Sequence, residues 1–499
     1  MQKPAMPQPF AAKNYAFTEY VNIKNWIGGA WRDGSSGNWL DIENPRHGKT
    51  IGKMTISTTK DVDAAVEAAK KAFPAWRATP MRERAQVLMR LKVLMERDLD
   101  ELCWLVSHEN GKTYAEGKGD VEKGIECVEF AASLHMMADG GQLDVSRGVN
   151  CRVTHEPLGV VAGIVPFNFP VMVPLWMAPN AIMAGNAFIL KPSEVVPYGA
   201  MKLAALFQEA GLPDGIFNVV NGQRECVEAI VDHADIKAVG FVGSTKVAKI
   251  LYARGAATGK RMLCLGSAKN HVVVVPDADV ALTSTNIVAS SYGCAGQRCM
   301  ASSLMVAVGD VQKIIDGIAD NVRKIRLGDD MGSIISAASR ERILKYIEEA
   351  EKAGAKVLVD GRGQKVDGAG GHWIGPTVLD NVTSRCLRAA KRSSGRCSPS
   401  CTPRRSMRPS TCRTRACMRT ARPSSPPRAS SRAPRRSASR PAWSASTSAC
   451  PCRVSRSASV ASTPPSSATA TSRAGMASAS GAAPRRSPRS GPLRPTRAG

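Results

Sequence analysis

The chain has 499 residues, more than a single hydrophobic core normally organises, so we expect two or three domains. Its formal net charge of +26 is of the size found in nucleic-acid-binding proteins, but the excess lies at one end. Residues 385–499 contain 25 Lys and Arg and no Asp or Glu, which leaves 43 of the 68 basic residues against all 42 acidic ones. The first 384 residues are therefore nearly neutral, at +1, and give no reason to expect a nucleic-acid partner.

Seven of the 14 cysteines also lie in residues 385–499. The other seven show neither disulfide-framework nor metal-ligand spacing: Cys103, Cys127, Cys151, Cys226, Cys264, Cys294 and Cys299. Residues 1–10 lack the apolar run of a signal peptide, and no apolar stretch reaches the roughly 18 residues that a membrane-spanning helix needs. We therefore expect a cytoplasmic protein without a metal and without a membrane contact.

The first part of the chain carries a strand signal and then three helix signals. Residues 25–31, followed by Asp33-Gly34, are typical of a strand and a turn. A helix is predicted from Thr59, with Pro74 close to its end, because apolar residues recur there at helical spacing. Two more helices are predicted, from Met81 to about Cys103 and from about Tyr114 to Met137.

After Gly159 the chain alternates between short apolar runs and amphipathic segments, which predicts strand–helix units and a parallel sheet. The apolar runs are residues 159–165, 187–190, 216–220 and 238–242, and the helical connections are residues 197–210, 225–234 and 245–256.

Polar motifs stand where these predicted strands end, which is where open parallel sheets bind ligands. They are Pro166-Phe167-Asn168-Phe169-Pro170, Lys191-Pro192-Ser193-Glu194 and Gly243-Ser244-Thr245. Lys191 can hydrogen-bond a ribose or a phosphate, Glu194 can accept a hydrogen bond from a ribose hydroxyl, and Gly243-Ser244 opens a helix whose first amides suit a phosphate. Each motif alone is equally typical of solvated surface or of a turn, so the argument rests on their joint placement.

Cys299, in Gly296-Gln297-Arg298-Cys299, is a candidate nucleophile. A thiol beside a cation can be held as the thiolate, which attacks carbonyl carbon. The alternative is that Cys299 is a small buried hydrophobic residue, as most free cysteines are.

In their order and spacing, these motifs, with Phe241-Val242 before Gly243, resemble the aldehyde dehydrogenase superfamily, and the resemblance covers residues 20–384. Further segments resemble its CoA-acylating methylmalonate-semialdehyde dehydrogenases: residues 109–113, 119–120, 124–126 and 266–271. The resemblance implies an α/β fold with a Rossmann-type NAD-binding domain at 20–265, including an oligomerisation segment near 138–157. It also implies an α/β catalytic domain at 266–384, incomplete here, before an aberrant tail at 385–499.

The resemblance further implies that Cys299 attacks the aldehyde while the Asn168 amide and the Cys299 backbone N–H stabilise the oxyanion. Hydride would pass to NAD bound by Phe167, Lys191, Glu194 and Ser244, leaving a thioester on Cys299. Arg298 and Lys123 are candidate partners for a substrate carboxylate.

Hydrolytic relatives release the acyl group with water activated by the glutamate of a Glu-Leu-Gly-Gly motif, where this chain has Cys264-Leu265-Gly266-Ser267. Because that general base is missing, the residues fit CoA as the acyl acceptor. We therefore expect NAD-dependent, decarboxylating oxidation of malonate or methylmalonate semialdehyde to an acyl-CoA, as in valine catabolism. The alternative within the fold is a hydrolytic aldehyde dehydrogenase.

Residues 385–499 depart from the family pattern and are rich in Ser, Arg, Pro and Ala, a composition that predicts disorder. Codons can be chosen for residues 386–410 and 457–469 that, in another frame, encode family segments containing Glu-Glu-Ile-Phe-Gly-Pro and Phe-Ser-Phe-Gly-Gly. This indicates a frameshift near Arg385, which is either a sequencing error or a real lesion. A real lesion would remove the strand that joins subunits in the family's dimers and tetramers, and it would impair folding and activity. The alternative from another class is an inactive chain whose basic tail binds polyanions.

Overall fold

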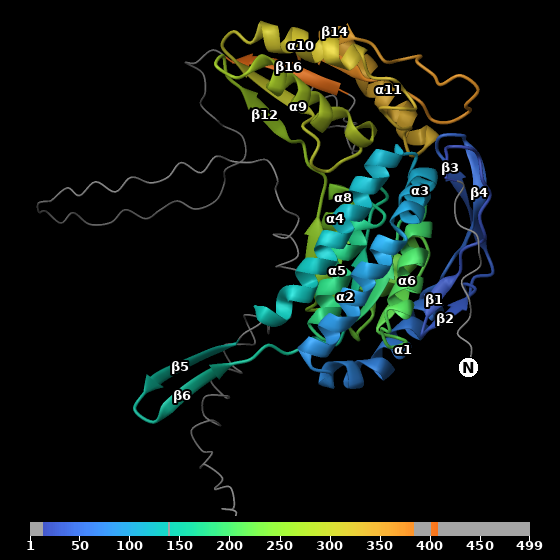
Figure 1. The fold of residues 1–499 in the computed structure, drawn as a ribbon, viewed down its shortest axis with the longest axis vertical. Coiled ribbons are helices and arrows are strands. Elements are labelled where there is room, and N and C mark those ends of the chain that lie inside the picture. The colour runs from blue at the N-terminus through green and yellow to red at the C-terminus, as the bar shows by residue number, and fades with distance from the viewer. Residues whose placement is uncertain (1–12, 138–139, 384–400, 408–499) are drawn as a thin grey trace, which may run out of the picture.

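The computed structural model describes residues 13–137 and 140–383 and the backbone of a strand at residues 401–407. Two hydrophobic cores divide the described chain. The first extends from Tyr20 to Leu251 and the second from Val274 to Val382. Figure 1 shows the second unit, in yellow and orange, above the larger first unit.

The first unit is built on a seven-stranded sheet in the order β11-β10-β7-β8-β9-β1-β2. Its parallel part comprises β7 (Val160–Ile164), β8 (Ala187–Lys191), β9 (Phe217–Val219), β10 (Ile236–Val242) and β11 (Arg261–Leu265). The antiparallel edge comprises β1 (Asn25–Ile27) and β2 (Ala30–Arg32). Every residue of β7 and β8 is buried, as expected for parallel strands covered on both faces. The predicted parallel sheet is confirmed.

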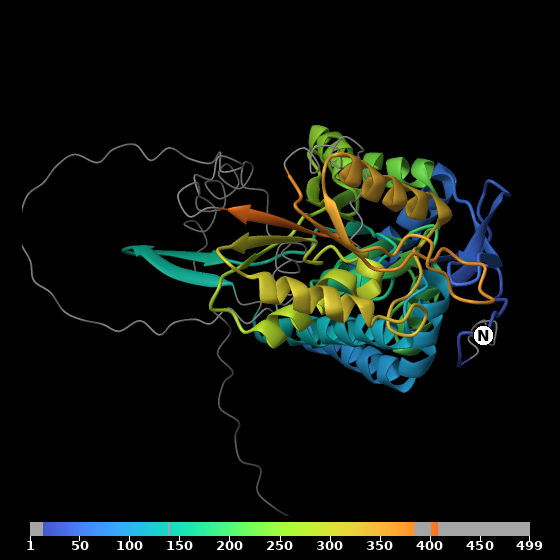
Figure 2. The same ribbon diagram turned by 90° about the horizontal axis from the view of Figure 1, so that it is seen from above.

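Helices cover both faces of this sheet. On one side, α5 (Met172–Met183) packs on β7 and β8 and α6 (Tyr198–Glu209) on β9; on the other, α7 (Arg224–Asp232) and α8 (Thr245–Ala257) pack on β10, and α8 also on β11. From β7, the strands β8 and β9 are added in chain order toward one edge of the sheet, whereas β10 and β11 are added on the other side of β7. The strand order therefore reverses between β7 and β10. Seen from above, blue amino-terminal helices lie on one side of the molecule and green helices on the other (Figure 2).

The amino-terminal helices confirm one set of predicted boundaries and correct two others. Helix α1 (Thr59–Ala78) starts after the capping residue Thr58 and ends four residues past Pro74, as predicted. The helix predicted at 81–103 is two helices, α2 (Met81–Arg97) and α3 (Leu99–Asn110), because the chain turns at Asp98, whose carboxylate pairs with Arg97 and Lys202. Helix α4 (Tyr114–Ser133) ends earlier than predicted and is followed by the short η1 (Leu134–Met136).

Two hairpins complete the first unit. The first pairs β3 (Trp39–Asn44) with β4 (Lys49–Thr55). The second pairs β5 (Gly141–Ser146) with β6 (Val149–Val153) and extends away from the rest of the chain in Figure 1. It falls within the segment predicted to mediate oligomerisation and exposes Leu143, Val145 and Val153, while the oligomer itself stays a prediction.

The second unit contains a five-stranded sheet in the order β12-β13-β16-β15-β14. These strands are β12 (His271–Val274), β13 (Leu304–Val308), β14 (Lys356–Val359), β15 (Thr377–Asp380) and β16 (Cys401–Met407). The helices are α9 (Val280–Tyr292), followed by the short η2 (Gly293–Gly296), α10 (Gln312–Arg323) and α11 (Ala337–Lys352).

Strand β16 belongs to the segment predicted as an aberrant, disordered tail, and the rest of residues 385–499 lies outside the described residues. It runs parallel between β13 and β15, with Pro403 opposite Leu379 and Arg404 opposite Met305. Proline donates no ladder hydrogen bond and is normally confined to edge strands. The sequence of β16 therefore fits its central position poorly.

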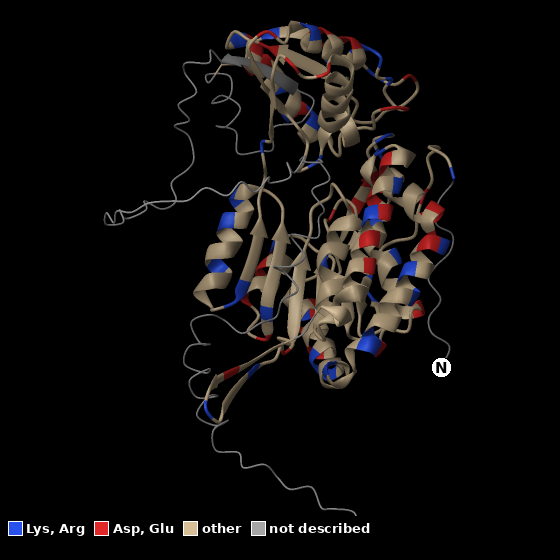
Figure 3. Ribbon diagram, turned by 60° about the vertical axis from the view of Figure 1, so that its left-hand side comes forward, with Lys and Arg blue, Asp and Glu red and all other residues tan. Residues whose placement is uncertain are grey.

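Over the helices of the described chain, acidic and basic residues are interspersed, in keeping with the near-neutral balance of residues 1–384 (Figure 3). No helix among the described residues is long and apolar enough to span a membrane.

Candidate active site

A cavity of ≈ 340 Å³ lies between the two units, at the carboxyl ends of the parallel strands. The first unit contributes the ends of β7, β10 and β11, and the second contributes the loop before β13 and the start of α11. The lining residues are Pro166, Phe167, Asn168, Val173, Trp176, Val242, Gly243, Ser244, Gly266, Ser267, Ala268, Gly296, Gln297, Arg298, Cys299, Ile334, Ser339, Arg342 and Ile343. Five of the eight predicted site residues thus lie together: Cys299, Asn168, Phe167, Ser244 and Arg298.

Cys299 lies half-buried at the cavity, on the loop between η2 and β13. Asn270, just before β12, donates hydrogen bonds from Nδ2 to the Cys299 carbonyl at 2.8 Å and to the Ala301 carbonyl at 3.1 Å. These bonds fix the backbone on which the thiol is carried.

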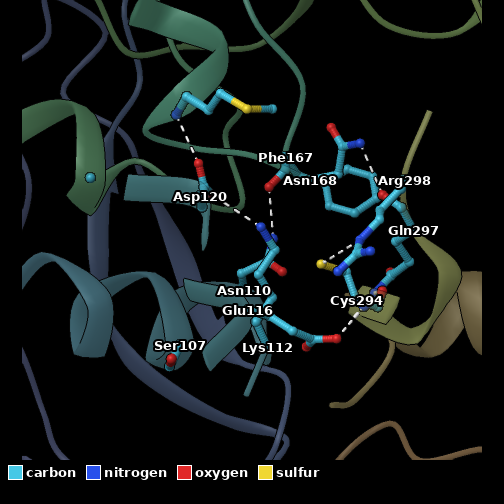
Figure 4. A network of polar contacts seen from close by, with 12 residues as sticks. Ser107, Asn110, Lys112, Glu116, Asp120, Phe167, Asn168, Cys294, Gln297 and Arg298 are labelled. Carbon is cyan, nitrogen blue, oxygen red and sulfur yellow. Dashed lines mark hydrogen bonds and ion pairs between the residues drawn. The ribbon is translucent and has the colours of Figure 1, made fainter. Parts of the chain in front are cut away.

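Asn168 reaches this loop from the opposite unit. Its Nδ2 donates to the backbone carbonyl of Gln297 at 2.9 Å (Figure 4). The segment before it is held in turn, because Asn110 Nδ2 donates to the Phe167 carbonyl at 2.7 Å. An amide nitrogen carries two hydrogens, so one bond to Gln297 leaves Asn168 a second donor.

The turn before Cys299 is strained. Cys294 and Ala295 have φ values of 54° and 48°, in the left-handed region, and Gly296 follows with φ 67°. A left-handed conformation costs a residue other than glycine about 1–2 kcal/mol, so other contacts must hold this turn. The backbone N–H of Gln297 donates to the Cys294 carbonyl at 2.9 Å, and the Cys294 N–H donates to Glu116 Oε1.

Arg298 is held in one orientation at the cavity. Its Nε lies 3.2 Å from Cys294 Sγ, and a Cβ on Gly293 would lie 2.4–2.6 Å from the guanidinium, so a larger residue at position 293 would displace the guanidinium from this position. Burial raises the pKa of the Cys294 thiol, although Lys112 and Arg298 oppose the shift. Cys294 therefore contacts Arg298 as a neutral thiol.

The residues at the point where the strand order of the sheet reverses, between β7 and β10, fit a dinucleotide. Gly243 follows β10, and a Cβ there would lie 2.4 Å from the Phe241 ring, so a larger residue would displace that ring. Ser244 caps α8 by accepting from the Val247 N–H at 3.4 Å, which leaves the first amides of that helix at the cavity end of β10. The positive end of a helix at the carboxyl edge of a parallel sheet suits a pyrophosphate.

Lys191 and Glu194 lie at the end of β8, beside β7, and neither is among the described residues that line the cavity. They form an ion pair, with Lys191 Nζ 2.9 Å from Glu194 Oε2. Burial acts to raise the pKa of Glu194, but the charge and hydrogen bond of Lys191 outweigh it and the pKa is lowered. Glu194 is therefore an ionised acceptor, which is what a bond from a ribose hydroxyl requires.

Lys123 is not brought to the cavity lining. It lies half-exposed on α4, with Nζ 2.8 Å from both carboxylate oxygens of Glu126 one helical turn away. A role for Lys123 in substrate binding stays a prediction.

Sequence reasoning missed Arg342 and Ser339, which line the cavity from the first turns of α11. Arg342 Nη2 donates to Ser339 Oγ at 3.1 Å, while its buried Nε has no partner among the described residues. It is thus a second cation at the cavity. The sequence offered only an Arg on an amphipathic helix, which is normally solvated.

None of the described residues that line the cavity is Asp, Glu or His. Gly266 and Ser267 occupy the part of the lining that follows β11, and burial raises the pKa of the neighbouring Cys264 thiol. The described residues of the lining thus include a thiol, two side-chain amides and two guanidinium groups, and none of them carries a carboxylate or imidazole that could deprotonate water.

A doubly wound parallel sheet whose strand order reverses beside a cavity, with a cysteine-bearing loop across it, is the architecture of a dinucleotide-dependent oxidoreductase. The sequence profile of the "Aldehyde dehydrogenase family" matches residues 31–391. The chain belongs to the aldehyde dehydrogenase family, and the expected fold and enzyme class, an NAD-dependent oxidoreductase, are confirmed.

The chain is also similar to individual proteins of this family. "Malonate-semialdehyde dehydrogenase 2" of Geobacillus thermodenitrificans is 46% identical over 373 residues, which cover 73% of this chain and 77% of that protein. Methylmalonate-semialdehyde dehydrogenase of Oceanimonas doudoroffii matches in structure with a TM-score of 0.75 and 39% identity, over 78% of this chain and 81% of that one. A Sinorhizobium meliloti 1021 protein assigned as a methylmalonate-semialdehyde dehydrogenase and solved with NAD matches with a TM-score of 0.74 and 38% identity, over the same shares.

Proposed function

We propose that this enzyme oxidises malonate or methylmalonate semialdehyde with NAD and transfers the acyl group to CoA, with loss of CO₂. The observation that carries the proposal is the cavity lining, in which Cys299, Asn168 and Arg298 face one space that contains no Asp, Glu or His among its described residues. The two named relatives and the NAD-bound neighbour support the substrate class and the cofactor.

In the first step Cys299 Sγ attacks the aldehyde carbon, so that a C–S bond forms and the carbonyl oxygen gains the electron pair. The free N–H of Asn168 and the backbone N–H of Cys299 stabilise that oxyanion. NAD, when bound, supplies the acceptor for the hydride that leaves the same carbon as the oxyanion reverts to a carbonyl. The product on the chain is a thioester of Cys299.

Arg298 would hold the substrate carboxylate, because a fixed guanidinium pairs well with a carboxylate. The thioester then carries its carboxylate on the adjacent carbon, so CO₂ can leave while its bonding electrons move toward the thioester oxygen. The oxyanion donors stabilise the resulting enolate, which a proton quenches.

Release of the acyl group needs a nucleophile that requires little activation. A CoA thiol has a pKa near that of cysteine, whereas water needs a general base. CoA attacks the thioester carbon, the C–S bond to Cys299 breaks, and the thiolate is regenerated. A hydrolytic aldehyde dehydrogenase would need a base that the lining does not supply among its described residues.

For NAD, Phe167 and Ser244 lie at the cavity, and Lys191 with Glu194 marks the adjacent strand end. Arg342 adds a cation that can offset the charge of a phosphate or a pyrophosphate.

We also propose that residues 385–499 result from a change of reading frame near Arg385. Pro403 fits the centre of a five-stranded sheet poorly, because it donates no ladder hydrogen bond. The neighbouring β15 is wholly buried, and a strand beside it is normally apolar, so both observations support the proposal. Resequencing codons 370–420 tests it directly. A missing or extra nucleotide is the expected result, and an unchanged sequence would leave an enzyme with an impaired catalytic unit.

CoA dependence tests the proposed function. Malonate semialdehyde and NAD should give sustained NADH formation only with CoA, and acetyl-CoA should accumulate with it. Sustained NADH formation without CoA would favour the hydrolytic alternative. Activity is measured on the chain in the frame that resequencing establishes.

A further inference from the structure

The carboxylate of Glu116 joins the two units at the turn before Cys299. Its Oε2 accepts from the backbone N–H of Thr113 at 3.1 Å, completing the capping box at the start of α4. Its Oε1 accepts from the backbone N–H of Cys294, which belongs to η2 in the second unit (Figure 4). One helix cap thus reaches beyond its own helix to the loop that carries Cys299.

The bond to Cys294 acts at the strained part of this loop. Cys294, Ala295 and Gly296 are consecutive left-handed residues. The Cys294 carbonyl is fixed by the backbone N–H of Gln297 at 2.9 Å and by Gln297 Nε2 at 3.2 Å. Glu116 fixes the amide of the same residue, so both polar backbone groups of Cys294 are held.

This left-handed turn also positions Arg298, because the Sγ of Cys294 contacts Arg298 Nε and Gly293 leaves the space that the guanidinium fills. Relaxation of Cys294 toward an ordinary φ would move its Sγ and release Arg298. Cys299 follows directly in the chain.

We propose that Glu116 is a positioning residue for the reaction: it holds the left-handed turn closed, and the closed turn places Arg298 at the cavity. The effect on substrate choice rests on the proposed function of Arg298, whereas the effect on the turn does not. A carboxylate is needed because each oxygen accepts a backbone N–H, whereas a glutamine has one acceptor oxygen and would direct its NH₂ group at the other amide.

The test compares Glu116→Gln with Thr113→Ala in the full chain. Thr113→Ala removes only the hydroxyl that accepts from the Glu116 N–H, so it weakens the helix cap and leaves the bond to Cys294. Each protein is treated with iodoacetamide for increasing times and digested with trypsin. Cleavage after Arg298 separates two peptides with one cysteine each, 270–298 with Cys294 and 299–313 with Cys299.

Cys294 is 2% exposed, so its alkylation reports opening of the turn. We expect its alkylation rate to rise roughly tenfold or more in Glu116→Gln and to stay within about twofold in Thr113→Ala. Cys226, 0% exposed in the first core and alone in peptide 225–237, reports wider unfolding. Equal protection of Cys294 in both variants, or equal acceleration of Cys226, would overturn the proposal.

A second measurement compares kcat/KM for malonate semialdehyde with kcat/KM for propanal. The ratio should fall roughly tenfold in Glu116→Gln, because Arg298 is displaced, and should be unchanged in Thr113→Ala. An unmodified enzyme without preference for the carboxylated substrate would contradict the proposed role of Arg298, and the alkylation rates would still decide the role of Glu116. An accelerated Cys294 with an unchanged ratio would overturn the link to Arg298.

Discussion

Asn168 donates its side-chain amide to the backbone carbonyl of Gln297, 2.9 Å away, although 129 positions separate the two residues. This bond connects the end of β7 with the loop that carries Cys299. It holds the Asn168 amide at this loop before any substrate arrives, so under the proposed function little rearrangement is needed when negative charge develops.

Replacement of Asn168 by Ala should lower kcat about 10²–10³-fold, because an oxyanion donor acts mainly on the transition state. KM for the aldehyde should change little. Steady-state NADH formation measures both constants. A change confined to KM would show that Asn168 binds the ground state instead.

Cys299→Ser should lose roughly 10³-fold or more of the turnover, since the thioester can no longer form. Cys264→Ser is the matched control, because Cys264 lies on β11 beside the cavity lining and outside the proposed chemistry. Mass spectrometry after incubation with NAD and semialdehyde should find an acyl group on peptide 299–313. An acyl group on another cysteine would reassign the nucleophile.

Arg298→Leu should raise KM for the semialdehyde acid roughly 10–100-fold, since a charged hydrogen bond to the substrate is lost. KM for propanal should stay within about twofold, because that substrate has no carboxylate. Equal effects on both substrates would remove the assignment. Lys123→Leu provides the comparison for the other predicted carboxylate partner.

Lys191→Met and Arg342→Met should each raise KM for NAD, by roughly tenfold or more, because each removes a cation expected to face the cofactor. Lys92→Met is a suitable control, since Lys92 pairs with Glu96 and Glu129 on the outer helices. Titration of NAD at saturating semialdehyde and CoA measures the constants. Unchanged KM in Arg342→Met would remove that residue from the site.

The buried ion pair of Lys112 and Asp120 makes a prediction about stability. Their side chains are 1% and 0% exposed, Nζ lies 2.9 Å from Oδ2, and Lys112 Nζ lies 4.0 Å from the centre of the Phe169 ring. Lys112→Met leaves the carboxylate unpaired and should destabilise the fold by about 3–5 kcal/mol. The double variant Lys112→Met and Asp120→Asn should cost less, since Asn can still accept from the Met172 N–H. Urea unfolding curves compare the two, and equal losses would contradict the explanation.

Local pattern predicted the parallel sheet, and five of the eight named site residues meet at one cavity. Their residue types and their positions at strand ends are local properties, which sequence shows. The start of α1 at Thr59 and its end shortly after Pro74 were also predicted from local signals. The break at Asp98 was missed, because the ion pair of Asp98 with Lys202 in a distant helix is not visible in the local sequence.

The remaining site residues could not be predicted for a similar reason. Arg342 and Glu116 belong to helices that read as ordinary amphipathic segments. Thr113-x-x-Glu116 is a recognisable capping box, but its contact with Cys294 joins residues 178 positions apart. Lys123 was expected to bind substrate, and the structure pairs it with Glu126 on the helix surface.

The most direct test of the central claim is rapid mixing of the enzyme with NAD and malonate semialdehyde, with and without CoA. We expect a burst of about one NADH per active chain without CoA, followed by arrest at the thioester, and continuous turnover to acetyl-CoA once CoA is added. Continuous NADH formation without CoA would contradict the account, because it would show that water releases the acyl group from Cys299.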